Sequence, residues 1–512
     1  MLARIHSAAV YGVDAYPVVV EVDVARAQNL SVTVVGLPDA AVRESCERVQ
    51  AAVRNSGFEF PRERITINLA PADIRKEGPA FDLPIALGIV LATGQAAVDD
   101  VLDTVAVTGE LSLDGQVRSV SGALPMAIGS RTAGRAAIIV PPDNGNEAAV
   151  VDDIEVFTCE SLYDCVRLLE SHLSAQPVQV SPEDTDLQAA PYDADMADVR
   201  GQDHVKRALE IAAAGGHNCL MVGPPGSGKT MLARRVPSIL PPMTLEEALE
   251  VTKLYSVKGL MSGGHALIRT RPFRHPHHSV STAGLIGGGT IPQPGEVSLA
   301  HHGVLFLDEF PEFPRAALEV LRQPLEDGDV TIARAQMSLT FPARFQLIAA
   351  MNPCPCGFFT DSQRECTCGP ANIQRYLKQI SGPLLDRIDI HIEVPRLTPD
   401  EVMSRRQGEG STAIRARVAT ARQRQLKRFE DTPFLNNSHM TSKALREFCP
   451  LSDEAAALLK TAIGQFALSA RAHDRIIKLA RTIADLDGAE DIGVAHIAEA
   501  VQYRAMDRRF WG

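Results

Sequence analysis

The stretch GPPGSGKT, residues 223–230, follows the apolar run Asn218–Val222 and precedes the helix-like run MLARRV. A strand, a glycine-rich turn and a helix in this order form a phosphate-binding loop, because the glycines let backbone N–H groups close around phosphates. Lys229 would reach the β- and γ-phosphates, and the Thr230 hydroxyl would bind Mg²⁺. The sequence therefore predicts an ATP site on a parallel α/β sheet. The loop residues are Gly223, Pro224, Pro225, Gly226, Ser227, Gly228, Lys229 and Thr230.

Two further apolar runs end in polar residues that would complete a hydrolytic site. Val304–Leu307 predicts a buried strand that presents Asp308 and Glu309 at its C-terminal end. The first carboxylate would hold the Mg²⁺ shell, and the second would polarise the attacking water. Gln346–Met351 predicts another strand, and Asn352 after it could orient water near the γ-phosphate or simply end the strand before a proline.

Two arginines are candidates for stabilising charge in the transition state. Arg387 lies among apolar residues just before the strand-like run His391–Val394. A planar guanidinium there could neutralise charge on the ATP of a neighbouring subunit. Arg471 opens a predicted helix, from which it could contact nucleotide bound to its own subunit. Either arginine could instead form a structural ion pair.

Changes in composition divide this chain of 512 residues, which is too long for one core. Residues 1–173 alternate strand-like and helix-like runs, including a predicted helix at Asp39–Asn55. Residues 174–198 contain three prolines and six acids without lysine or arginine, which predicts an acidic linker. Residues 199–395 carry the nucleotide motifs, and the helical spacing of apolar residues in 396–512 predicts an all-α lid.

Composition narrows the class of protein. Hydrophobic residues make up 45% and charged residues 22%, as in soluble globular proteins. Without a signal-like N-terminus or an apolar run of about 18 residues, we expect a cytoplasmic protein and no membrane partner. The net charge of −12 disfavours a basic exterior that coats nucleic acid, but it leaves open DNA held inside a ring.

Four of the nine cysteines lie close together, at Cys354, Cys356, Cys366 and Cys368. Four thiolates in a loop rich in glycine and proline could form a tetrahedral Zn²⁺ site. The C-x-C spacing is less usual than C-x-x-C, so free thiols are the alternative. A second metal site is a weaker hypothesis, since histidines in nucleotide-binding proteins more often bond within the fold; it would involve His275, His277, His278, His301 and His302.

The order of these motifs resembles that of AAA+ ATPases, and more narrowly their magnesium-chelatase-like branch. The segments at 271–309, at 351–357 (MNPCPCG) and at 381–395 (SGPLLDRIDIHIEVP) are similar to the ComM/YifB family. This resemblance implies a homo-hexamer that hydrolyses ATP and drives branch migration of DNA during recombination in natural transformation. It places functional groups at Lys229, Thr230, Asp308, Glu309, Asn352, Arg387 and Arg471.

The resemblance also suggests where DNA would bind. The stretch between the P-loop and Asp308 is similar to an insertion of helicase-like AAA+ proteins, and Val330–Ile348 then predicts a hairpin. Arg334 and Arg344 are its candidate pore contacts, with solvated charges as the alternative. A predicted helix is a second candidate for DNA or subunit contacts, or a solvated face; it carries Arg415, Arg417, Arg422, Arg424, Lys427 and Arg428, in a basic run that starts at Arg405.

The N-terminal domain resembles the α+β proteolytic domain of Lon. Lys76–Ala80 (KEGPA) parallels the KDGPS segment of Lon-type proteases, and Thr108–Leu111 parallels their TGE segment. Ala80 stands in the place of the nucleophile, and Ser121–Met126, where the partner lysine would lie, contains no lysine. Because covalent catalysis needs a nucleophile and a base, we expect a scaffold or substrate-contacting module.

Three classes of function follow. The first is an ATP-driven DNA motor. The second is an ATPase that powers a partner enzyme, as in magnesium insertion into porphyrins, and the Lon-like domain disfavours it. The third is an ATP-dependent protease, which Ala80 disfavours.

Overall fold

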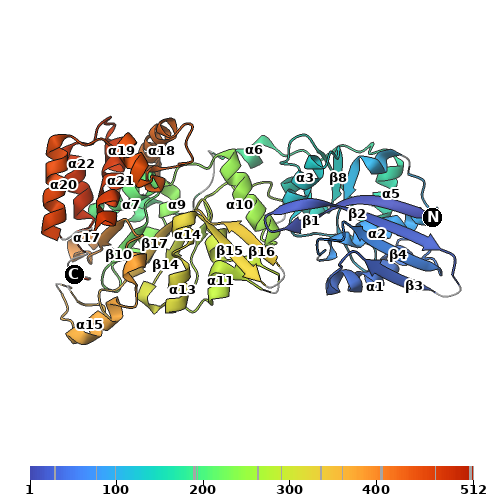
Figure 1. The fold of residues 1–512 in the computed structure, drawn as a ribbon, viewed down its shortest axis with the longest axis horizontal. Helices are drawn as coiled ribbons and strands as arrows, with labels where there is room; N and C mark the ends of the chain where they lie inside the picture. Colours follow the sequence, from blue (N-terminus) through green and yellow to red (C-terminus); the bar gives the residue numbers. More distant parts are fainter. Residues whose placement is uncertain are drawn as a thin grey trace. The chain divides into compact units, whose positions relative to one another are not determined.

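The computed structural model describes the chain from Met1 to Phe510, apart from residues 28, 29, 77, 99, 188–191, 193, 262, 263, 290, 335, 336, 360, 362, 404–407, 467, 468, 505 and 507–509. The chain forms two compact units, Met1–Asp186 with Leu245–Arg269 and Leu187–Thr244 with Thr270–Gly512 (Figure 1). The first unit takes in the beginning of the predicted linker, and the predicted lid belongs to the second unit together with the nucleotide core.

The first unit is built on a seven-stranded mixed sheet with the order β3-β4-β2-β1-β5-β8-β9. Its strands are β1 (Leu2–Tyr11), β2 (Asp14–Ala25), β3 (Ser31–Val35), β4 (Arg64–Ala70), β5 (Val105–Val107), β8 (Ala137–Val140) and β9 (Glu155–Thr158). Its main helices are α1 (Ala40–Asn55), α2 (Asp82–Ala92), α3 (Ala123–Thr132) and α5 (Leu162–Glu170). The predicted helix at Asp39–Asn55 is confirmed as α1, which Asp39 caps by accepting a hydrogen bond from the Val42 N–H at 2.8 Å.

Residues 245–269 belong to the first unit, whereas the predicted division assigns them to the nucleotide core. Helix α10 (Leu245–Val257) packs against α3 of the first unit. The Gly122 N–H, just before α3, donates to the Ser256 carbonyl at 2.9 Å. Local composition could not indicate this assignment, because it depends on packing between segments more than 100 residues apart.

The second unit contains a five-stranded sheet with the order β11-β14-β17-β10-β18, in which all neighbours are parallel. The strands are β10 (Cys219–Val222), β11 (Phe273–Arg274), β14 (Val304–Leu307), β17 (Gln346–Met351) and β18 (Ile390–Glu393). Strands β10, β14 and β17 are buried throughout, as expected for apolar runs between helical layers. The carboxyl ends of parallel strands share one edge, so the loops after β10, β14 and β17 meet there.

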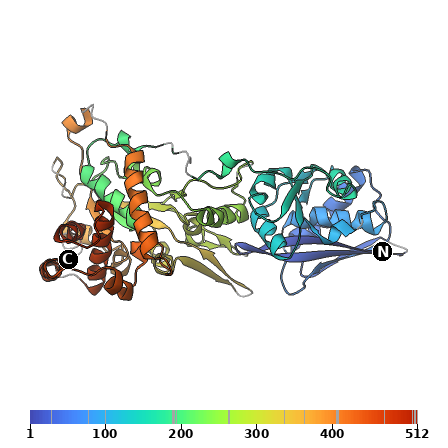
Figure 2. The same cartoon turned by 90° about the horizontal axis from the view of Figure 1, so that it is seen from above.

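Helices dominate the C-terminal part of the second unit. They are α18 (Ser411–Arg428), α19 (Ser442–Phe448), α20 (Asp453–Phe466), α21 (Ala470–Asp487) and α22 (Val494–Gln502). Figure 2 shows the red C-terminal helices gathered beside the orange α18. Helices α18 and α21 also pack on α7 (Asp203–Gly215), which joins the helical part and the parallel sheet in one hydrophobic core. In the described part of the chain, no helix is long and apolar enough to cross a membrane.

Two antiparallel hairpins accompany the five-stranded sheet. One pairs β15 (Asp329–Arg334) with β16 (Met337–Pro342), which confirms the hairpin expected within Val330–Ile348. The other pairs β12 (Gly287–Gly288) with β13 (Gln293–Pro294). They touch, since a Cβ at Gly287 would lie 2.7 Å from the Ile332 side chain.

Candidate functional site

The loop between β10 and α8 (Lys229–Ala233) has a backbone that requires its glycines. Gly226 and Gly228 have φ angles of 78° and 90°, a left-handed region that residues with a Cβ rarely adopt. Gly223 is close-packed, because a Cβ there would lie 2.2 Å from the Val394 carbonyl oxygen. The loop can therefore approach phosphates with its backbone N–H groups, as the sequence predicts.

Lys229 is the first residue of α8, directly after this loop, and is only 9% exposed. Its ammonium donates to the carbonyl oxygens of Gly223 at 2.7 Å and Pro224 at 3.0 Å, and to Asn352 Oδ1 at 3.3 Å. Burial lowers the pKa of the Lys229 ammonium to about 8. Phosphate oxygens would favour the charged form, so this lysine suits a triphosphate.

Thr230 of α8 and Asp308, which follows β14, come together. The Thr230 hydroxyl donates to Asp308 Oδ2 at 2.6 Å, and the Glu309 N–H donates to Asp308 Oδ1 at 2.9 Å. A hydroxyl and a carboxylate side by side are hard oxygen ligands of the kind Mg²⁺ takes beside phosphates. This donor set fits Mg²⁺ bound with ATP.

Glu309 has a backbone that is unusual for a residue with a side chain. Its φ angle is 51°, a left-handed conformation that costs on the order of 1–3 kcal/mol and persists where the surrounding structure enforces it. Its carboxylate is 55% exposed and lies 3.0 Å from His278 Nδ1. Glu309 is thus held beside Asp308, within reach of solvent.

The sequence predicts His278 only as a candidate metal ligand, whereas in the structure its ring contacts Glu309. It follows β11, and β11 neighbours β14 in the sheet, so the loops after the two strands lie together. No local pattern marks this residue, because β11 has only two residues, Phe273 and Arg274, and sheet order is not visible in the sequence. His278 can donate to the carboxylate or release it.

Arg387 and Arg471 do not join this group of residues. Arg387 forms an ion pair with Glu326, and Arg471 Nη1 lies 3.6 Å from Asp386 Oδ2. Among the described residues, neither arginine has a hydrogen bond or ion pair to residues 223–230. Within the single chain, both arginines form ion pairs, which the sequence allowed as the alternative to a catalytic role. Action of Arg387 across a subunit interface stays a prediction.

The four cysteines form a compact cluster. Cys354 Sγ lies 3.3 Å from Cys356 Sγ and 3.6 Å from Cys366 Sγ, and all four sulfur atoms lie within 4.8 Å of one another. Tetrahedral Zn²⁺ with bonds of about 2.3 Å separates its sulfur ligands by about 3.8 Å, which is close to this spacing. Backbone N–H groups of Phe359 and Cys368 point at sulfur atoms, at 3.3 and 3.4 Å, as suits thiolates. The cluster fits a structural Zn²⁺.

The cysteine loop borders the nucleotide site. Cys354 follows Asn352 by two residues. A Cβ at Gly357 would lie 2.5 Å from Pro225 Cδ, so the loop presses on the phosphate-binding turn. The cluster therefore supports both Asn352 and the P-loop, a connection that the cysteine spacing does not reveal.

The predicted DNA contacts occupy two different places. Arg334 is the last residue of β15, pairs with Met337 at the start of β16, and is exposed. Arg344 lies beyond the end of β16, where its backbone bonds to His301 and His302 at 3.0 and 2.7 Å. Only Arg334 sits near the tip of the hairpin, since the ladder ends before Arg344.

Several basic residues of α18 already have acidic partners. Arg417 Nε donates to Glu210 at 2.6 Å, and Arg428 Nη1 donates to Asp485 at 2.9 Å. Arg405, the start of the predicted basic run, lies outside the described residues. These ion pairs favour a structural role for Arg417 and Arg428.

The N-terminal unit has apolar side chains where a peptidase would carry its nucleophile and base. Ala80 is 7% exposed, and its carbonyl accepts a hydrogen bond from the Thr108 hydroxyl at 3.3 Å. Met126 of α3 lies beside them, with its sulfur 3.5 Å from the same hydroxyl. Glu77, within the Lon-like KEGPA segment, lies outside the described residues.

The chain is similar to known proteins over most of its length. Family models described as "Magnesium chelatase, subunit ChlI", "Subunit ChlI of Mg-chelatase" and "Magnesium chelatase, subunit ChlI C-terminal" match residues 195–402, 20–144 and 408–504. YifB of Escherichia coli K12, described as uncharacterized, is 44% identical over 509 residues, 99% of this chain and 98% of YifB. The competence protein ComM of Haemophilus influenzae is 44% identical over 512 residues, with the same coverage. Lon protease 2 of Bacillus subtilis is 26% identical over 195 residues, 35% of this chain and 34% of that protease.

Proposed function

Because the chain belongs to the ComM/YifB family of magnesium-chelatase-like proteins, we propose that it is an AAA+ ATPase that drives branch migration of DNA. One observation carries the ATPase part of this proposal: hydrogen bonds join the start of α8 to the residues that follow β14 and β17. They link Thr230 to Asp308 and Lys229 to Asn352. A relative of nearly equal length is named a competence protein, which supports a role with incoming DNA.

Each residue has a defined part in ATP hydrolysis. Lys229 would neutralise the β- and γ-phosphates, and Thr230 with Asp308 would hold the Mg²⁺ that accompanies ATP. Glu309 would orient the attacking water and draw off its proton once the His278 contact opens. Asn352, bonded to Lys229, would orient the same water or the γ-phosphate. Bound Mg²⁺ supplies charge that stabilises the phosphates during transfer.

For DNA, we propose a ring of six subunits that surrounds the strand or duplex. The exposed Arg334 at the hairpin tip supports this, because a ring presents the same cation six times to the phosphates. An acidic chain with a net charge of −12 can thereby bind DNA through a few basic tips. Contacts of this kind depend little on base sequence.

The test follows a labelled four-way junction in the presence of ATP. We expect wild type to convert it to product strands and Lys229→Ala to leave it unchanged. Arg334→Ala should weaken binding at low salt and lower the slope of log Kd against log salt by about one unit for each phosphate that is no longer neutralised. Arg344→Ala is the matched control, since Arg344 lies away from the tip and should change binding less. No binding and no strand exchange at low salt by assembled rings would contradict the DNA motor.

A second function, an ATPase that powers a partner enzyme, gains support from the comparisons. The Lon-like domain speaks less against it, because the family model that matches residues 20–144 also names a magnesium chelatase subunit. ATP turnover that ignores every DNA substrate would favour this function. A protease is disfavoured by Ala80 and by the apolar surroundings of Thr108.

We propose that the cysteine cluster binds one Zn²⁺ as a structural clasp. Elemental analysis of purified protein should find about one zinc per chain, and the double variant Cys356→Ser, Cys366→Ser should lose it and unfold at lower temperature. Cys46→Ser, in α1 of the other unit, is the control and should keep its zinc. Zinc-free wild type with four reactive thiols in this loop would rule out the clasp.

A further inference from the structure

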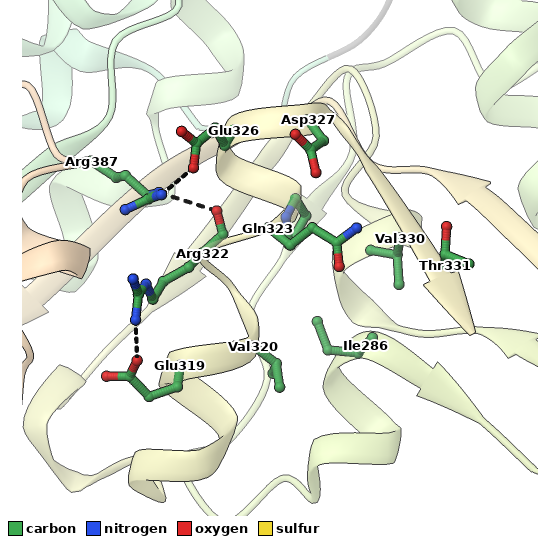
Figure 3. Close-up of a pocket in the computed structure, with 11 residues that line it drawn as sticks. Ile286, Glu319, Val320, Arg322, Gln323, Glu326, Asp327, Val330, Thr331 and Arg387 are labelled. Carbon is green, nitrogen blue, oxygen red and sulfur yellow. Dashed lines mark hydrogen bonds and ion pairs between the residues drawn. The ribbon is translucent and has the colours of Figure 1, made fainter. Parts of the chain in front are cut away.

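The surroundings of Arg387 contain a feature that the proposed function does not use. An open pocket of about 530 Å³ lies beside it, lined by charged side chains of both signs and by polar and apolar ones (Figure 3). The wall includes Glu326 and Asp327 of α14 (Pro324–Asp327), and Val330 and Thr331 at the start of β15. The pocket thus lies between the candidate transition-state arginine and the base of the candidate DNA hairpin.

Three contacts hold the Arg387 guanidinium within its own chain. Its Nε donates to the Arg322 carbonyl at 3.1 Å, its Nη1 donates to the Pro383 carbonyl at 2.8 Å, and its Nη2 pairs with the Glu326 carboxylate. Figure 3 shows the guanidinium turned toward Glu326 and Arg322. With its side chain only 14% exposed, the charge is compensated by a carboxylate and largely covered. In this position it is poorly placed to stabilise a phosphate.

The Glu326 contact can be exchanged for a stronger one. Glu326 is 62% exposed, so its ion pair with Arg387 is screened by water and weak. A guanidinium binds phosphate through charge-assisted, often bidentate bonds, and a γ-phosphate beside Mg²⁺ offers several oxygens. ATP on a neighbouring subunit would therefore compete well with Glu326 for Arg387.

Glu326 is connected to the hairpin by a short stretch of backbone. Helix α14 ends at Asp327, Gly328 turns the chain with a φ of 76°, and β15 begins at Asp329. The Ala343 N–H, after β16, donates to the Gly328 carbonyl at 2.8 Å, so both strands are tied to this turn. A displacement of the hairpin would be passed to α14 and to the Glu326 carboxylate.

We propose that Glu326 is a positioning residue that holds Arg387 withdrawn in its own protomer. Movement of α14 and β15, when the hairpin binds a nucleic-acid strand, frees the guanidinium for the ATP of the neighbouring subunit. The proposal rests on the proposed function, because it needs Arg387 to act across an interface. It adds a route by which DNA raises the rate of hydrolysis.

The experiment compares Glu326→Gln with Asp327→Asn in steady-state ATP turnover, with and without a DNA junction. Glu326→Gln should raise kcat without DNA about two- to fivefold, the size expected when an exposed ion pair is removed. Stimulation by DNA should fall by the same factor, and KM for ATP should stay unchanged because the residues around Lys229 are intact. Asp327→Asn removes an equal charge from the same helix but leaves the carboxylate that pairs with Arg387, so it should behave as wild type.

A fall in kcat for Glu326→Gln, an unchanged kcat, or an equal effect of Asp327→Asn would overturn the proposal. Glu326→Asp, which keeps the charge, should restore most of the DNA stimulation, and thermal unfolding of the variants should match wild type. A separate experiment tests whether Arg387 acts across an interface at all. If it does not, mixed rings of Arg387→Ala and Lys229→Ala subunits will show no complementation. Complementation with an unchanged Glu326→Gln would reject the positioning role of Glu326 alone.

Discussion

Glu309→Gln should lower kcat for ATP hydrolysis by about 10²- to 10⁴-fold, the range expected for loss of a general base. The amide cannot accept the proton of the attacking water, although it fills the same space. ATP binding should survive, because Lys229, Thr230 and Asp308 remain in place. Single-turnover and steady-state kinetics of ATP hydrolysis check this result, together with a separate measurement of ATP affinity.

Lys229→Ala should abolish turnover for a different reason. The loop loses its buried ammonium and with it the hydrogen bonds to Gly223, Pro224 and Asn352, so ATP affinity should fall together with kcat. Glu312→Gln is the matched control for Glu309→Gln, because the Glu312 carboxylate lies three residues after Glu309 and is exposed. It should leave turnover unchanged. Normal turnover in Glu309→Gln or Lys229→Ala would show that the site is misassigned.

Arg387→Ala should lower kcat by about 10³- to 10⁵-fold if the guanidinium stabilises transition-state charge across an interface. The activity should be recoverable by mixing, which is the more decisive result. A 1:1 mixture with Lys229→Ala subunits pairs an intact P-loop with an intact arginine at about a quarter of the interfaces of a ring. Turnover should therefore reappear in the mixture, at up to about a quarter of the wild-type rate.

The double variant Lys229→Ala, Arg387→Ala is the control for this experiment. Mixed with Arg387→Ala subunits, it supplies no arginine at any interface, so turnover should stay absent. If no ratio of the two single variants recovers turnover, Arg387 does not act in trans. Its ion pair with Glu326 would then describe its whole role.

The parts of the ATP site that lie within one strand and its following loop could be predicted from the sequence. GPPGSGKT follows the strand β10, and Asp308 and Asn352 follow β14 and β17 as expected. The left-handed φ angles at Gly226 and Gly228 explain why this loop needs glycine. Such motifs are readable because a strand end, a turn and a helix start are decided by residues adjacent in the chain.

The contacts between those parts depended on the tertiary structure. The sheet order puts β11 beside β14, which brings His278 to Glu309. Strands β10 and β18 are parallel neighbours. Arg387 precedes β18 and the P-loop follows β10, so the two lie at opposite ends of these strands. Packing, not local pattern, assigned residues 245–269 to the N-terminal unit. Apolar periodicity predicts that a segment is buried, but many partners can bury it equally well. Which distant segment does so is decided by the packing of the whole chain, and that choice made the Glu309–His278 and Arg387–Glu326 contacts.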